Sequence, residues 1–112
     1  MTYIQRIAAH LKALCEAGMT QRQLANRLGF KTGNVVNMHM NPESSIAPFP
    51  LKRLPALCAC AQLDPREAMS LVLARTKDHG DAPTQLDQRT LKWILSTAQK
   101  AKTLLAESRD AR

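Results

Sequence analysis

The chain has 112 residues, of which 45% are hydrophobic and 22% are charged, and its formal net charge at pH 7 is +7. This composition is typical of a globular protein and excludes a disordered tail. No stretch approaches the roughly 20 apolar residues that are needed to span a bilayer, and the basic balance favours a polyanionic partner such as nucleic acid or an anionic membrane surface.

The positive charge concentrates in the first two thirds of the chain. Residues 1–76 carry nine Lys and Arg against four Asp and Glu, whereas residues 77–112 carry seven against five. The three cysteines, Cys15, Cys58 and Cys60, fall at or near apolar helical positions. Their spacing suits neither a zinc site nor a disulfide. Because no signal peptide is recognisable, the sequence predicts a cytoplasmic protein with reduced thiols in or near the core.

The sequence predicts an all-α chain. Five short helices are expected in residues 1–76, followed by a linker at 77–83 and an amphipathic helix within 84–112. Apolar residues recur at helical spacing over about 3–17, 20–28, 32–40, 50–61, 64–76 and 84–108.

Capping residues mark the ends of these helices. Thr20 and Gln23 have capping-box spacing, and Gly29 suits the left-handed residue that ends a helix. Asp64 is placed to cap the fifth helix, directly before a proline. Pro55 lies in the early turns of the fourth helix, where it either shifts the helix start or kinks the helix.

Residues 21–40 fit a helix-turn-helix template position by position. Counted from Gln21, Ala25 at the fifth position is small enough for two helices to cross, and Gly29 at the ninth accepts a positive φ without strain. We expect the apolar template positions to bury one face of the third helix and to leave the opposite face free for the major groove of DNA. These apolar positions are Leu24, Leu28, Phe30, Val35 and Met38.

The sequence here resembles the Cro and phage-repressor type of helix-turn-helix family, often called Xre-like. The resemblance covers about residues 4–76 and is carried by Met19-Thr-Gln-Arg-Gln-Leu-Ala-Asn-Arg-Leu-Gly-Phe30, Thr32-Gly-Asn-Val-Val-Asn-Met38 and Leu63-Asp-Pro65. It implies a five-helix repressor-type domain and a sequence-specific transcriptional regulator of double-stranded DNA. A repressor is favoured because so short a chain leaves no room for an effector-binding or activation domain.

By position, the resemblance implies which residues contact DNA. Asn37 is suited to an adenine edge, whereas Gly33 has no side chain and so departs from the family pattern. Base contacts are implied for Thr32, Gly33, Asn34 and Asn37. Phosphate contacts, which orient the protein rather than specify sequence, are implied for Gln21, Arg22, Lys31, Lys52 and Arg53. His39 is equally suited to the DNA backbone and to an ordinary surface position.

The last helix has a wide apolar stripe, which either packs on the preceding domain or pairs with a second chain. Because one helix-turn-helix unit covers a half-site only, we expect a homodimer on an inverted-repeat operator. The stripe approximates two heptads and comprises Leu91, Trp93, Ile94, Leu95, Ala98, Ala101 and Leu105.

Two other functions remain open at this point. The first is an antitoxin-type or other interaction module that binds a partner protein through the last helix. The second is a non-specific nucleic-acid binder, against which the full template match and the scarcity of aromatic stacking residues both argue. The sequence shows no arrangement typical of an enzyme, a metal site or a cofactor site, so we expect none, and we expect no membrane partner.

Overall fold

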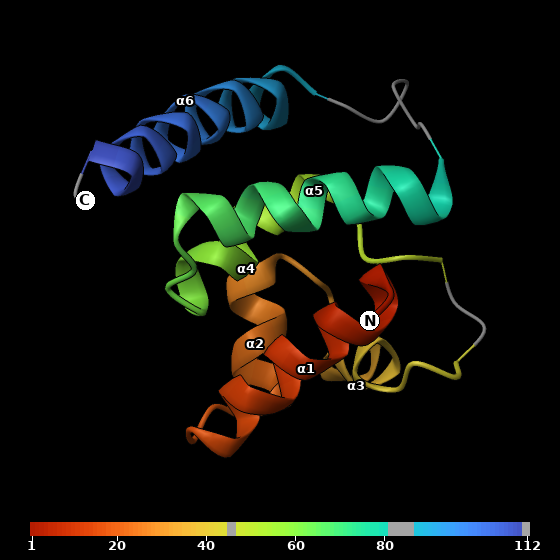
Figure 1. Cartoon of the computed structure of the whole chain (residues 1–112). Helices are drawn as coiled ribbons and strands as arrows, with labels where there is room; N and C mark the ends of the chain where they lie inside the picture. Colours follow the sequence, from red (N-terminus) through yellow and green to blue (C-terminus); the bar gives the residue numbers. More distant parts are fainter. Residues whose placement is uncertain (45–46, 81–86, 111–112) are drawn as a thin grey trace.

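The structure, a computed structural model, describes residues 1–44, 47–80 and 87–110. Within these residues all regular structure is helical, so the all-α prediction is confirmed (Figure 1). The elements are α1 (Tyr3–Glu16), α2 (Gln21–Leu28), α3 (Gly33–Met40), the 3-10 helix η1 (Leu51–Arg53), α4 (Leu54–Cys60), α5 (Pro65–His79) and α6 (Gln88–Asp110). None of the helices in these ranges is both long and apolar enough to cross a membrane.

The helix ends follow the capping chemistry of the sequence. Thr20 and Gln23 form a reciprocal capping box, and Gly29 ends α2 in the left-handed conformation with φ of 84°. The Asp64 carboxylate accepts a hydrogen bond from the Glu67 backbone N–H at the start of α5. Pro55 lies in the first turn of α4, where a missing N–H costs nothing, because the 3-10 turn shifts the start of this helix to Leu54.

The linker begins later than the sequence predicts. Helix α5 ends at His79 rather than near Thr76, so the first three expected linker residues are helical. The last turn is held by the start of α1, since the backbone N–H of Tyr3 donates to Asp78 Oδ2 at 2.7 Å and its ring packs edge-on against His79. Helix α6 begins at Gln88, and the expected start near Thr84 lies outside the described residues.

The core lies between α1, α2, α3, α4 and α5. Its largest completely buried side chains come from every one of these helices and from the loop before η1, and burial of each stabilises the fold by about 1.5–3 kcal/mol. They are Tyr3, Ile7, Leu11, Leu24, Leu28, Val36, Phe49, Leu54, Leu57 and Leu71. Of the cysteines, Cys58 is buried and Cys15 and Cys60 are half-buried, and all three are free thiols, as expected. Burial raises the pKa of the Cys58 thiol to about 11.

The loop that follows α3 is held at one carbonyl oxygen. The backbone oxygen of Phe49 accepts hydrogen bonds from Tyr3 Oη at 2.7 Å and from Arg75 Nε at 3.1 Å. Arg75 is itself buried, with 6% of its surface exposed. Two helices far apart in sequence therefore fix the segment that leads into η1.

The face of α3 that packs inward carries Gly33, Val36 and Met40, which share one side of a helix. Val36 is completely buried and Met40 packs against the core. Val35 and Met38, the two core positions of the sequence template, are only partly buried and do not belong to the core cluster. The template assignment of these two residues to the core is therefore wrong.

The physical reason for this register is the close approach of α3 to the start of α2. A Cβ on Gly33 would lie 3.3 Å from the backbone N of Arg22 and 3.3 Å from the carbonyl carbon of Gln21. Glycine removes that obstacle, and the helix face centred on Gly33 and Val36 turns toward α2. Val35 is consequently half-buried and lies outside the core cluster.

Helix α6 packs along α5, which lies between α6 and the α1–α4 group (Figure 1). Trp93 and Ile94 pack against the core, and Ala101 is buried. The sequence left open whether this helix packs on its own domain, and the structure shows that one of its faces does so. The other face leaves three leucines exposed, with fractions of 45% at Leu91, 63% at Leu95 and 54% at Leu105.

Candidate nucleic-acid interface

The starts of α2 and α3 lie side by side and present their polar side chains together. Gln21 Nε2, on the first residue of α2, donates a hydrogen bond of 3.3 Å to Asn37 Oδ1 in the middle of α3. Thr32 occupies the N-cap position of α3 with an extended backbone, and its hydroxyl makes no capping hydrogen bond. The exposed residues of this surface are Arg22, Lys31, Thr32, Asn34 and Asn37.

Gly33 differs from its neighbours in this group. The space where its side chain would be faces the backbone of α2 rather than the surface. The structure thus explains why glycine occupies a position where the resemblance implies a base contact: its place is between the helices. The polar surface of α3 is formed by the residues on either side of it.

The start of α2 carries backbone N–H groups that have no acceptor within the helix, and Gly33 of α3 packs close to one of them, that of Arg22. Thr20 Oγ1 accepts the backbone N–H of Gln23 at 3.1 Å, whereas the intrahelical ladder offers no acceptor to the N–H groups of Gln21 and Arg22. The helix dipole and these N–H groups favour a negative charge. The exposed Arg22 adds a full positive charge at the same end.

Lys52 and Arg53 lie on the other side of the α2–α3 turn. The Arg53 guanidinium stands 5.8 Å from the centroid of the Phe30 ring, a cation–π distance, and a Cβ on Gly29 would collide with it. The positive φ therefore favours glycine here, whereas the Arg53 guanidinium, at the far end of a flexible side chain, can move aside. Lys52 is exposed.

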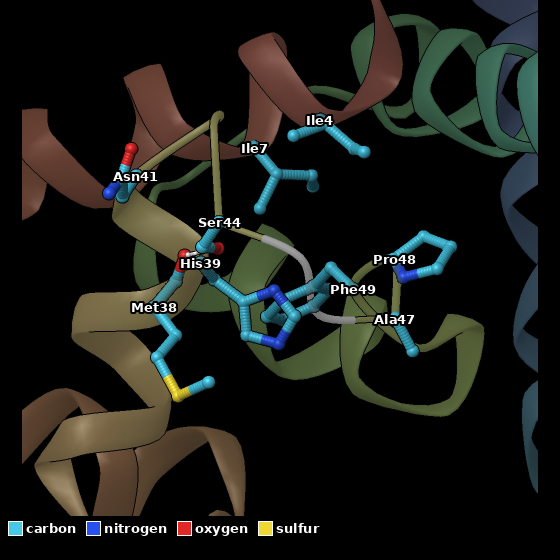
Figure 2. Close-up of a pocket in the computed structure, with 9 residues that line it drawn as sticks. All are labelled: Ile4, Ile7, Met38, His39, Asn41, Ser44, Ala47, Pro48 and Phe49. Carbon is cyan, nitrogen blue, oxygen red and sulfur yellow. Dashed lines mark hydrogen bonds between the residues drawn. The ribbon is translucent and has the colours of Figure 1, made fainter.

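His39 is a packing residue of this region and is only partly accessible. Its ring lies 5.7 Å from Phe30 and 5.3 Å from Phe49, centroid to centroid. Figure 2 shows His39 beside Phe49 at a small cavity of about 10 Å³, next to which the Ser44 hydroxyl donates to the Met38 carbonyl oxygen at 2.7 Å. Burial lowers the pKa of His39, so its neutral form is favoured in the folded protein.

Two further cations lie near Lys52 and Arg53. Arg27, at the end of α2, and Arg89, in the first turn of α6, line the same surface pocket. The sequence placed Arg27 on the exposed face of its helix but did not single out Arg89, because the position of Arg89 depends on how α6 packs. Among the described residues, no group of three or more His, Cys, Asp or Glu side chains is placed to hold a metal ion.

No family model matches this chain, and comparison with curated proteins and with solved structures finds no significant match. The functional argument therefore depends on the chain's own residues and their geometry.

Proposed function

We propose that the chain is a sequence-specific DNA-binding transcriptional regulator, a repressor of the helix-turn-helix type, that reads an operator with α3. The observation that carries this proposal is the α2–α3 pair itself. Two short helices are joined through a left-handed glycine, the second is pressed onto the first through Gly33, and the exposed residues of the second, Asn34 and Asn37, are polar. An exposed helix of this kind fits the major groove.

The residues of α3 divide into base-reading and packing roles. Asn34 and Asn37 carry amides that suit adenine, and Thr32 offers a hydroxyl and a methyl group. Val35, which is half-buried outside the core cluster, adds an apolar group that suits a thymine methyl. Gly33 sets the distance between α2 and α3, and so the angle at which the other four residues meet DNA.

Phosphate contacts come from both ends of the pair. The N-terminal N–H groups of α2, with Gln21 and Arg22, face one strand, and Lys31, Lys52 and Arg53 face the backbone beyond the turn. Gln21 also positions a base-reading side chain, because its amide holds the Asn37 carboxamide oxygen. This hydrogen bond uses the Asn37 carboxamide oxygen and leaves its NH₂ group without a hydrogen bond among the described residues.

We further propose that α6 joins two copies of the chain on an inverted repeat. One side of the helix carries the exposed Leu91, Leu95 and Leu105 together with the half-buried Ala98, at spacings of four, three and seven residues. Two recognition helices then meet half-sites about one turn of DNA apart.

The same leucines support a second candidate function, an antitoxin-type module that binds a different protein. A further exposed apolar side chain lies on α5, where 64% of the surface of Leu73 is exposed. The two candidates differ in one measurement. A chain that forms a stable dimer in light scattering uses this face for itself, whereas a chain that stays monomeric on DNA leaves it for a partner.

Selection of binding sites from randomised duplexes tests the leading proposal. We expect an enriched inverted repeat, protected in footprinting and bound by two chains. Asn37→Ala should cost about 1–3 kcal/mol on the selected site and relax one base position. Gln99→Ala, an exposed amide on α6, is the matched control and should change neither. Selection that enriches no sequence would reject the regulator.

A further inference from the structure

A basic pocket of about 310 Å³ opens beside the α2–α3 turn, where three separate parts of the chain meet. Arg27 comes from the end of α2, Lys52 and Arg53 from η1, and Arg89 from α6. Its lining includes Gly29, the residue that turns the chain toward α3. The pocket therefore adjoins the surface proposed to meet DNA, although most of the elements that line it (η1, α4 and α6) lie outside the α2–α3 pair.

Cations outnumber carboxylates among the described residues of this pocket. Asp87 is the one carboxylate among the described lining residues, against four cations, which gives this set a net charge of +3. Its Oδ1 accepts the backbone N–H of Thr90 at 2.7 Å, which caps α6. This hydrogen bonding, with help from the neighbouring Arg89 and Lys52, lowers the pKa of Asp87.

No ion pair within 4 Å joins any of the four cations to a carboxylate in the described parts of the chain. Folding brings four like charges together here with one carboxylate, Asp87, among them, which is unfavourable. Guanidinium groups match the oxygen geometry of phosphate and can bind it in a bidentate manner. An anion with several oxygens would offset the repulsion.

We infer that this pocket binds a phosphate group, and that the DNA backbone supplies it. The inference rests on the proposed function and extends it, because it makes Arg89, and thus the first turn of α6, part of the DNA-binding surface. The C-terminal helix then has two roles on two faces. Its start anchors the operator backbone, while its exposed leucines join the second copy.

Salt dependence measures this contact directly. Each phosphate neutralised by a protein cation contributes about 0.9 to the slope of log affinity against log salt. We expect Arg89→Gln to lower the slope by about one and to weaken matched and mismatched duplexes by the same factor. Wild type should therefore lose about threefold more affinity than the variant between about 50 mM and about 200 mM salt. Lys102→Gln, which removes the same charge from an exposed position further along α6, should leave the slope unchanged.

Inorganic pyrophosphate provides the second arm, followed through the arginine side-chain N–H resonances of the whole chain. We expect Arg53 and Arg89 to shift together in the wild type, and Arg53 to shift far less in Arg89→Gln.

The two arms separate the possible failures. An unchanged DNA slope with a pyrophosphate response would reject the DNA backbone and assign the pocket to a free phosphorylated molecule. A pyrophosphate response in a chain that binds no DNA would reject the proposed function and uphold the phosphate site. If neither the slope nor the resonances change, the pocket binds no phosphate and the inference is overturned.

Discussion

The α2–α3 pair and helix α6 differ in how they pack against the rest of the chain. In the pair, two eight-residue helices approach closely through glycine, and a single side chain, Val36, is completely buried on α3. Helix α6 has 23 residues and an apolar stripe that is wide enough to contact two surfaces. One of these contacts is made within the chain, where Trp93 and Ile94 pack against the core. A short helix positioned by backbone contact has a precisely fixed polar face, whereas a long amphipathic helix retains an apolar face for a partner.

The largest expected effect tests the register of α3. Val36→Asp places a charge in a completely buried site, which should destabilise the fold by at least about 3 kcal/mol. Val35→Asp puts the same group on the partly exposed side and should cost less than about 1 kcal/mol. Urea denaturation of both variants gives the comparison. Equal losses, or a larger loss at Val35, would show that the template register is the true one.

The two faces of α6 differ in the same way, with a smaller effect. Ile94→Ala removes apolar contacts with the core and should cost about 2 kcal/mol at any protein concentration. Leu95→Ala should change the stability of the monomer by less than about 0.5 kcal/mol and weaken the dimer instead. Thermal unfolding at several concentrations, together with light scattering, distinguishes the two. A monomer destabilised as much by Leu95→Ala as by Ile94→Ala would contradict the assignment of faces.

The caps of these elements were predictable from the sequence, because they depend on local chemistry. Thr20, Gly29 and Asp64 act within one turn of their own positions, and each has the role that its residue type indicated. The register of α3 was not predictable, since it depends on the fit between Gly33 and the backbone of α2. A template that counts apolar positions carries no information on the distance between Gly33 and the α2 backbone.

The candidate site shows the same division. The exposed residues at the start of α3 follow from their places along one helix, so the sequence indicated them. Arg89 was missed because it joins Lys52 only through the packing of α6, across a linker of unpredictable path. Similarly, the sequence showed which residues of α6 are apolar, but it did not show which of them would pack against α5.

The contact between α2 and α3 gives a third, smaller prediction. Gly33→Ala gains helix propensity of up to about 1 kcal/mol, but its Cβ meets backbone atoms at 3.3 Å that cannot rotate away. We expect a net loss of about 1 kcal/mol and amide chemical-shift changes that concentrate at Gln21 and Arg22. Asn34→Ala, on the exposed next position, should do neither. A Gly33→Ala variant that is more stable than the wild type would show that α2 and α3 leave space for a Cβ at this position.

The smallest effect is a pH dependence at His39, which packs the far side of α3 against Phe30 and Phe49. Burial lowers its pKa in the folded state from the ordinary value of 6.5. As pH falls through 6.5, the unfolded chain binds a proton that the folded chain resists, so stability is full above that pH and decreases below it. His39→Phe preserves the aromatic packing without the titration. Urea denaturation at pH values on both sides of 6.5 should therefore show that the variant loses less free energy of unfolding at acidic pH than the wild type does. Equal losses would show that His39 is protonated as easily in the folded protein as in the unfolded chain.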